Sequence, residues 1–435
     1  MQSVLRTLLC AAAAITISLL TACGSGSGTT VPANIRLVNA AAVALTLNLN
    51  GAPTTSATAP DSSSDYASVT PAQYTVGLQG TGVSTGAGST IGLGTAQSYT
   101  TIAYQQGNST NIYAIVDNQG TPASGFSSLD IANISVDAGA LDVYLVPHPY
   151  TSLTNYSPTF SSVEGTSTVA TVPSTASAGY DVVVTGTSSP NDVRLVLANP
   201  PLASGQPYTL ALTGTSGGAL VDSILIPQGI SVPASAFVTN PNARVRVWSA
   251  LQGGSNSEVL ATVGTTTLHQ DYAPTPSHYQ VVPGGSTVTA LTVTGGGTVT
   301  LPTDTFAAGG DYTILVYGTV AAPLAAVLTD VNRVIQSRAS VRVINAAISA
   351  VSGVTLLVNG SEESVGVAYG TDGATAGNPA SAYYGVVPAS GASFQLQGGL
   401  STSPWTVTGV PLVSGSVTSV LVYDTAQPPV IITDR

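Results

Sequence analysis

Hydrophobic and polar residues alternate along most of the chain downstream of residue 33. In the segment 34–41, Ile35 and Leu37 point to one face of an extended backbone, whereas Arg36 and Val38 point to the other. Comparable short segments are separated by Gly, Pro, Asn-Gly pairs and Ser/Thr clusters, which favour turns. This part of the chain lacks the 3.6-residue spacing of an amphipathic helix. The pattern therefore predicts an all-β protein of short antiparallel strands.

The opening strand recurs along the chain. Copies occupy 34–41, 243–250 and 340–347, and a weaker copy spans 131–137. A second repeated strand contains a Tyr near its start, at 98–104, 207–212 and 311–317, and a related strand spans 416–423. A repeat of about 100 residues holding several short strands is typical of tandem immunoglobulin-like antiparallel β-sandwich domains. We expect four such domains, at residues 33–128, 129–241, 242–338 and 339–435.

The first residues carry a pattern typical of export. Arg6 precedes an apolar segment of signal-peptide length at 7–19, which is short for a transmembrane helix. Leu20-Thr21-Ala22-Cys23 follows, and this box resembles the bacterial lipoprotein signal. The resemblance implies a signal peptide at 1–22, lipidation of Cys23, and a flexible linker at 23–32. An ordinary secretory signal with an accidental Cys is the alternative.

Two consequences follow from the lipoprotein resemblance. Gly24, at the position after the lipidated residue, resembles the pattern that directs lipoproteins to the outer membrane, on either of its faces. The membrane lipid around Cys23 is then one expected partner. The only other cysteine, Cys10, lies in the signal peptide, so the mature domains are expected to lack disulfides and catalytic or zinc-binding thiolates.

The opening strand and the strand that directly follows it, at 45–51, 141–146 and 354–360, resemble a bacterial envelope repeat, the family called domain of unknown function 4397. The residues that carry the resemblance are Arg36, Asn39, Ala40, Arg342, Asn345 and Ala346 on the opening pattern, and Ser135, Asp137, Asp142, Val143 and Tyr144 on the second. The usual Ser-Pro-Asp step is Ala-Ala in the first and fourth repeats. The resemblance implies secreted or anchored tandem β-domains, and it implies neither an activity nor catalytic residues.

Composition narrows the possible partners. Only 7% of the residues are charged, and the net charge is −11. Nucleic-acid binding is not expected, because it depends on clustered basic residues. A surface rich in Thr, Ser and Asn suits contact with envelope proteins or glycans through hydrogen bonds, and it equally suits a passive spacer.

Candidate catalytic and metal-binding groups are sparse. His269, Asp271 and His278 lie close in sequence and form the one combination that suits a metal site or a hydrolase, although solvated loop histidines are the simpler interpretation. His148 lies between two prolines, which also indicates a loop. Residues 214–218 match Gly-x-Ser-x-Gly but join two strands, so they predict a hairpin loop and not the nucleophile elbow.

Acidic residues offer little more. Paired carboxylates support glycoside hydrolysis, but Glu164, Glu258, Glu362 and Glu363 are the only glutamates, and the last two adjoin a turn. Asp61 to Asp65 lacks the alternating oxygens and Gly of a calcium loop. We expect no metal and no cofactor.

Aromatic side chains divide into two groups. The repeated positions of Tyr99, Tyr208 and Tyr312 favour core or corner packing. Trp248 and Trp405, with tyrosines outside the repeated strands, are candidates for a sugar-stacking surface. Those tyrosines are Tyr150, Tyr156, Tyr279, Tyr383 and Tyr384.

The sequence as a whole predicts a non-catalytic, lipid-anchored protein of the cell envelope with a structural, adhesive or binding role. A glycan-binding lipoprotein is the first alternative. An envelope hydrolase using His269, Asp271 and His278 is the second.

Overall fold

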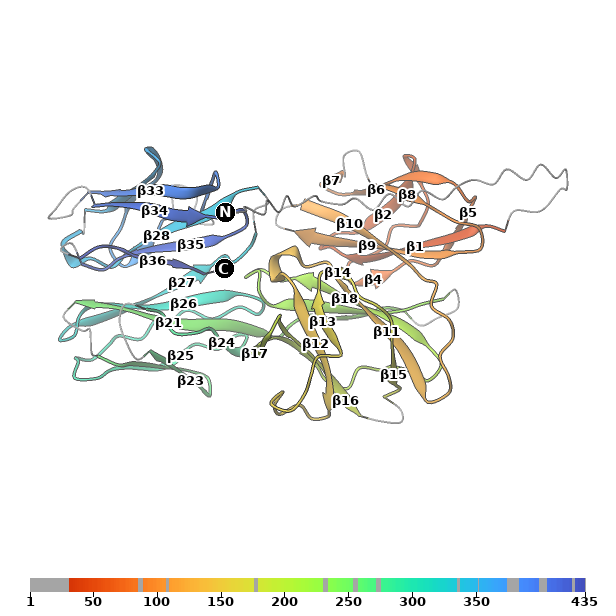
Figure 1. Cartoon of the computed structure of the whole chain (residues 1–435), viewed down its shortest axis with the longest axis horizontal. Helices are drawn as coiled ribbons and strands as arrows, with labels where there is room; N and C mark the ends of the chain where they lie inside the picture. Colours follow the sequence, from red (N-terminus) through yellow and green to blue (C-terminus); the bar gives the residue numbers. More distant parts are fainter. Residues whose placement is uncertain are drawn as a thin grey trace, which may run out of the picture.

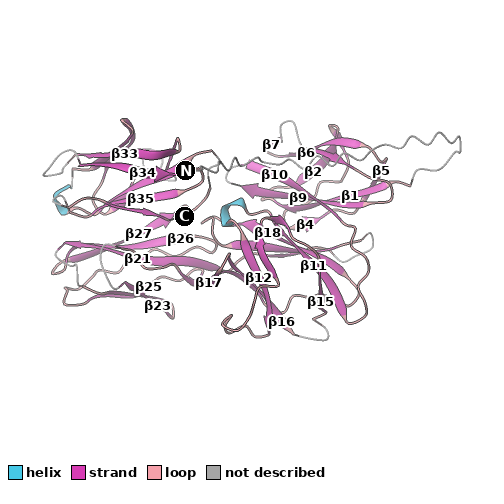
Figure 2. Ribbon diagram, viewed as in Figure 1, coloured by secondary structure: helices cyan, strands magenta, loops and turns pink. Residues whose placement is uncertain are grey.

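The computed structural model describes residues 31–84, 89–106, 109–175, 179–229, 234–252, 257–270, 275–334, 337–350, 352–373, 383–398, 405–424 and 427–434. Strands dominate these segments, and their helical residues lie in two 3₁₀ turns, η1 (Val136–Ala138) and η2 (Ile348–Ala350) (Figure 2). The all-β prediction is confirmed. No helix within the described segments is long and apolar enough to cross a membrane.

The strands pair within four groups, which we call the first to fourth units. The first unit has one sheet in the order β10-β9-β1-β4, with β5 also on β1, and a second in the order β3-β2-β6-β7, with β8 also on β6. Its strands are β1 (Ala33–Ala40), β2 (Leu45–Leu49), β3 (Ala52–Pro53), β4 (Ser62–Ser63), β5 (Ala67–Val69), β6 (Gln73–Gly80), β7 (Val83–Ser84), β8 (Thr90–Gly92), β9 (Ser98–Gln106) and β10 (Ser109–Val116).

The second unit repeats this plan. Its sheets run β14-β11-β18-β19-β20, with β15 also on β11, and β13-β12-β16-β17. Its strands are β11 (Phe126–Asn133), β12 (Leu141–Pro147), β13 (Phe160–Val163), β14 (Gly165–Thr166), β15 (Ala170–Pro173), β16 (Tyr180–Gly186), β17 (Ser189–Leu197), β18 (Pro207–Gly214), β19 (Val221–Pro227) and β20 (Ala236–Val238). Strand β11 begins at Phe126, before the domain boundary expected at 128/129.

The third unit has sheets β24-β21-β26-β27 and β23-β22-β25, and the fourth has β31-β28-β35-β36, with β32 also on β28, and β30-β29-β33-β34. The third unit contains β21 (Asn242–Gln252), β22 (Val259–Val263), β23 (Thr266–Gln270), β24 (Gln280–Pro283), β25 (Val288–Val293), β26 (Asp311–Thr319) and β27 (Pro323–Asp330). The fourth contains β28 (Ala339–Asn345), β29 (Val354–Val358), β30 (Ser361–Val367), β31 (Thr371–Asp372), β32 (Tyr384–Val386), β33 (Ala389–Gln397), β34 (Trp405–Leu412), β35 (Val417–Val422) and β36 (Val430–Thr433).

Each unit is a sandwich whose core lies between its two sheets. In the first unit, Ile35 and Leu37 of the opening strand meet Leu45 and Leu47 of the facing sheet, and all four side chains are fully buried. The period-2 alternation predicted this inward face. Separate clusters of the same kind fill the other three units.

The sheets are antiparallel except at one position in each unit. The opening strand pairs in parallel with the repeated late strand, as β1–β9, β11–β18, β21–β26 and β28–β35. A parallel pair needs a long crossover, and strands of the facing sheet supply it here. The Asn-Gly turns behave as their residue types indicate: Asn50 and Gly51 have φ of 49° and 80°, and Asn359 and Gly360 have φ of 51° and 85°.

The units stack in two pairs. Figure 1 shows the first unit above the second on the right and the fourth above the third on the left. Apolar side chains from the sheets that contain the opening strands fill both interfaces. They include Val38, Ile102, Ile134 and Ile224 between the first and second units, and Trp248, Leu315, Ile344 and Leu421 between the third and fourth.

Candidate functional site

A polar cluster recurs on the outer face of the sheet that contains the opening strand. In the first unit, Arg36 Nε donates to Thr100 Oγ1 at 2.8 Å, and the Thr100 hydroxyl donates to Asp117 at 2.7 Å. Tyr66 donates to the same carboxylate, and the Arg36 guanidinium lies 4.6 Å from the Tyr66 ring centroid. The opening strand therefore contributes Arg36, and the late strand contributes Thr100. Asp117 follows the last strand of the sheet, and Tyr66 precedes β5.

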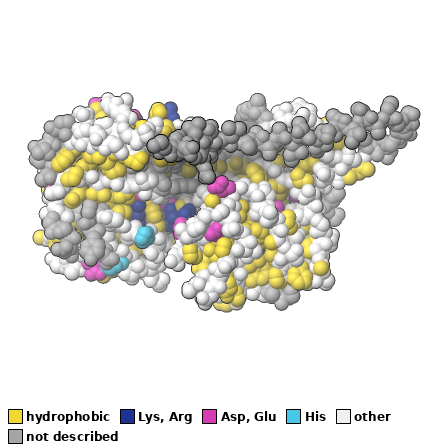
Figure 3. Space-filling view, viewed as in Figure 1, with side chains coloured by type: hydrophobic (Ala, Val, Ile, Leu, Met, Phe, Trp, Pro, Cys, Tyr) yellow, Lys and Arg dark blue, Asp and Glu magenta, His cyan; other side chains and the backbone are white. Residues whose placement is uncertain are grey.

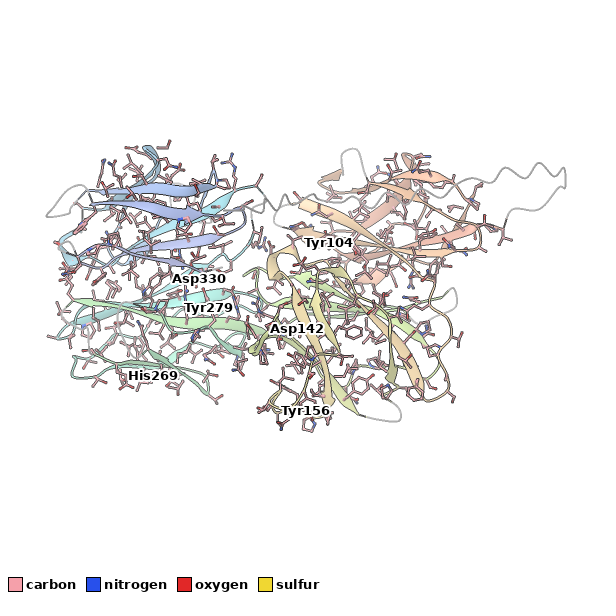
Figure 4. All side chains as sticks on the ribbon, in the orientation of Figure 1. Tyr104, Asp142, Tyr156, His269, Tyr279 and Asp330 are labelled. Atoms are coloured by element: carbon pink, nitrogen blue, oxygen red, sulfur yellow. The ribbon has the colours of Figure 1, made fainter. Side chains whose placement is uncertain are left out.

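The third unit repeats this cluster residue for residue. Arg246 Nε donates to Thr313 at 2.9 Å, Thr313 donates to Asp330 at 2.6 Å, and Tyr279 donates to Asp330 at 2.5 Å. The Arg246 guanidinium lies 4.6 Å from the centroid of the Tyr279 ring. Figure 4 shows Tyr279 and Asp330 close together on the side of the unit that faces its neighbour.

The fourth unit has a related cluster in which Arg342 Nε donates to the Ser419 hydroxyl at 2.8 Å and Ser419 donates to Asp434. The clusters of the third and fourth units exchange partners across their interface. Arg342 Nη2 of the fourth unit lies 2.6 Å from Asp330 of the third. Arg246 Nη1 of the third unit lies 2.7 Å from Asp434 of the fourth. The Arg342 and Asp330 side chains are 0% exposed. We call these four residues the ion-pair cluster.

The second unit carries a different set of residues at the same positions. Asp130 stands where the other units have Arg, and Gln228 stands where they have Asp. Gln228 donates to Thr209 at 2.8 Å, and Gln119 donates to Asp130 at 2.8 Å. Arg36 of the first unit then donates to the carbonyl of Pro227 at 2.6 Å. The first interface thus contains one guanidinium, which donates to a hydroxyl and to a backbone carbonyl across the interface.

The pKa of Asp330 at the second interface is shifted in the opposite direction from those of Asp117 and Asp130 at the first. Burial alone would raise the pKa of Asp330, but Arg342 and Arg246 outweigh it and hold that pKa below its usual value. Burial raises the pKa of Asp117 and of Asp130, and the hydrogen bonds that they accept only partly oppose it. Arg342 and Arg246 therefore favour the charged form of Asp330, whereas burial at the first interface disfavours the charged forms of Asp117 and Asp130.

A glycine loop joins the two pairs of units. Residues 214–218 connect β18 to β19 as the predicted hairpin loop. Gly217 donates to the carbonyl of Gly309, and Asn332 donates to that of Gly217, at 2.7 and 2.9 Å. A Cβ on Gly217 would lie 2.6 Å from the Asp311 backbone nitrogen. Arg333 Nε also donates to the Ser216 carbonyl. The Gly-x-Ser-x-Gly match is thus a docking contact.

A polar cleft opens beside this joint. Its volume is about 710 Å³, and side chains of the second, third and fourth units line it. In Figure 3, basic and acidic side chains gather in the hollow between the two halves of the molecule. The cleft includes His278 and Asp434, and at its base Arg244 makes two hydrogen bonds to the Asp311 carboxylate, at 2.9 and 2.7 Å.

The candidate histidines lie in different places. His269 contacts Glu258 and belongs to β23, so the expectation that it lies in a loop is wrong. His278 precedes β24, in the other sheet of the third unit, and lines the cleft. Asp271 lies outside the described residues. His148 is in a loop, with Nδ1 2.8 Å from Asp181. The described residues contain no group of three or more His, Cys, Asp or Glu that could hold a metal ion.

The other acidic candidates are dispersed over the surface. Glu164 and Glu362 are exposed, and burial raises the pKa of Glu363 above its usual value. Asp61 and Asp65 are exposed, and Asp61 lies on a smaller pocket with Asp222. Cys23 lies outside the described residues.

The repeated tyrosines pack at corners, as predicted. The hydroxyls of Tyr99, Tyr208 and Tyr312 each accept a hydrogen bond from a backbone N–H five residues upstream, at 2.8, 3.1 and 3.0 Å. The fourth unit has Thr418 at this position.

The prediction of exposed tyrosines was correct only in part. Tyr156 is 43% exposed. Tyr279 and Tyr383, however, pack against the buried arginines, since Arg342 lies 4.9 Å from the Tyr383 ring. Trp248 is fully buried between the third and fourth units, so it offers no surface to a sugar.

Sequence reasoning missed the ion-pair cluster. The available signal was the recurrence of Arg36, Arg246 and Arg342 at one register position, together with an Asp just after or at the end of the last strand. Repetition of a charged residue between apolar neighbours on the outer face points to a partner surface.

The fold and the repeated clusters define a tandem β-sandwich protein whose units are held together by buried polar contacts. Residues 33–144 match the family described as "Domain of unknown function (DUF4397)", so the resemblance expected from the strand motifs is confirmed there. No curated protein matches the chain. Among solved structures the chain is similar to the Bacillus anthracis TIE protein at 8% identity, with a TM-score of 0.14 over 88% of this chain and 69% of that one.

Proposed function

We propose that this protein is a non-catalytic, lipid-anchored platform of the cell envelope, whose four units act as one rigid body. The observation that supports it is the burial of charged groups between units. Arg342 and Asp330 come from different units, and both side chains are fully buried. A flexible string of domains would leave such groups in water, because burying a charge is costly unless it is paired.

Rigidity is tested by spin-label distances across the molecule. The mature chain has no Cys other than Cys23, so Cys23→Ala allows labels at exposed positions, here Gln105→Cys in the first unit and Val365→Cys in the fourth. We expect one narrow distance distribution between the two labels. A broad distribution would contradict the rigid platform.

Anchoring is tested separately in cells. The box before Cys23 and the short linker after it support attachment close to the bilayer. Cys23→Ala is expected to move the protein from the membrane fraction to the soluble fraction, whereas Cys10→Ala is the matched control and should leave it with the membrane. Retention of the Cys23 variant in the membrane would exclude the lipid anchor.

A further inference from the structure

The polar cleft has no part in the platform function proposed above. It is bounded by the β16–β17 hairpin of the second unit, by the start of β24 in the third and by Asp434 in the fourth. Its volume of about 710 Å³ lies within the range of small-molecule sites. Since three units form its walls, the cleft exists only when the units are docked.

The charges at the cleft are balanced pair by pair. Arg194 Nη2 lies 2.5 Å from Asp192, which also lies 3.6 Å from Arg244 Nη1. Arg244 forms its closer ion pair with Asp311, and Asp434 pairs with Arg246. A cleft in which each lining charge has an opposite partner produces little net field, so it gives no advantage to an ionic ligand.

Most of the exposed lining residues carry neutral hydrogen-bonding groups. Ser188, Ser189, Asn191 and Gln280 are exposed there, and so are His278 and the apolar Pro190. Hydroxyl and amide side chains both donate and accept hydrogen bonds, which matches the hydroxyl groups of a sugar.

The base of the cleft is held in place without a ligand. The Asp311 carboxylate accepts from Arg244 and from Asn332, the latter at 2.8 Å, and Arg244 also lies 4.5 Å from the Tyr279 ring centroid. These contacts hold the base of the cleft in one conformation. Binding to a pre-organised site costs less conformational entropy than binding that must order the site.

We propose that this cleft binds a short, uncharged glycan through the hairpin residue Asn191 and the strand residue Gln280. This inference rests on the docked arrangement of the proposed platform, but it is independent of the lipid anchor.

The test is calorimetric titration of the full mature chain. The probes are neutral tri- and tetrasaccharides of glucose, galactose, mannose and N-acetylglucosamine, with trigalacturonate as the acidic probe and a tetraserine peptide as the peptide probe. We expect saturable binding of at least one neutral saccharide, and weaker or no binding of the other two probes. Tighter binding of trigalacturonate or of the peptide would overturn the assignment, as would a panel without any neutral ligand.

Substitutions locate the site. Asn191→Ala and Gln280→Ala should each weaken neutral-saccharide binding by about three- to ten-fold, the effect of losing one or two hydrogen bonds. Gln73→Ala is the matched control, because Gln73 is also an exposed glutamine at the start of a strand, and it should bind as the parent chain does. Unchanged binding in both cleft variants would overturn the assignment.

The spin-label pair separates the two proposals. A narrow distance distribution without glycan binding would overturn the cleft assignment alone. A broad distribution would overturn the platform and the cleft together.

Discussion

The ion-pair cluster leads to the strongest prediction for stability. Replacing Asp330 by Asn keeps an oxygen to accept from Tyr279 and Thr313 but removes the charge that faces Arg342 at 2.6 Å. Both side chains of this pair are 0% exposed, so the variant leaves a buried guanidinium with a weaker set of partners. Breaking a fully buried pair typically costs about 3–5 kcal/mol.

The expected loss is large enough for a thermal assay. For a cooperative unit of about 200 residues, such as the third and fourth units together, 3–5 kcal/mol corresponds to a fall of about 6–20 °C in Tm. Calorimetry of the full chain at pH 7 should show this fall in one transition only. Hydrogen exchange should assign that transition to β26, β27, β28 and β35.

Asp372→Asn is the matched control for Asp330→Asn. Asp372 also contacts Arg342, at 3.2 Å, but its side chain is 16% exposed, and burial raises its pKa above the usual value. The charged form of the Asp372 carboxyl is therefore disfavoured in the folded state, and Asp372→Asn should change Tm by no more than about 3 °C. If Asp330→Asn unfolds within the same narrow range, the ion pairs do not hold the two units together.

The remaining predictions concern the first interface, the lower pH limit of the second, and the joint. The pKa values of Asp117 and Asp130 are raised in the folded state, so the stabilisation from their neutral forms is present below pH 3.8 and is lost as pH rises through the raised values. Amides at the first interface should therefore be better protected from hydrogen exchange, relative to the unfolded chain at the same pH, at the acidic end of this range. Equal protection at both ends would contradict this. The lowered pKa of Asp330 has the opposite sign. Its contribution is present above pH 3.8 and is lost as pH falls through the lower folded pKa, so the protection of amides at the second interface, measured against the unfolded chain at the same pH, should decrease in acid. Gly217→Ala should destabilise the docked state by about 1–3 kcal/mol, because its Cβ would meet the Asp311 backbone. Gly92→Ala is the control, since a Cβ there meets no atom within 4 Å. Equal hydrogen-exchange rates at residues 309–333 in the two variants would show that the 214–218 loop does not hold the second and third units together.

Local patterns predicted the elements well. Alternation placed Ile35 and Leu37 on the inner face, and the Asn50-Gly51 pair formed the expected hairpin turn, because both depend on the geometry of a few neighbouring residues. The same reasoning placed His269 in a loop and Tyr279 on the surface, and both were wrong. Their surroundings depend on strands and units that are distant in sequence.

The sequence by itself determined the all-β class, the repeat and the inward face of each opening strand, since side-chain direction in a strand follows from the backbone alone. Only the tertiary structure decided what covers the outward face. Val38 and Arg36 lie on that face and are 0% and 3% exposed because another unit packs on them. Alternation gives the side of a strand to which a residue points, but it contains no information about the neighbour on that side. The ion-pair cluster and the cleft therefore arise from how the units pack together.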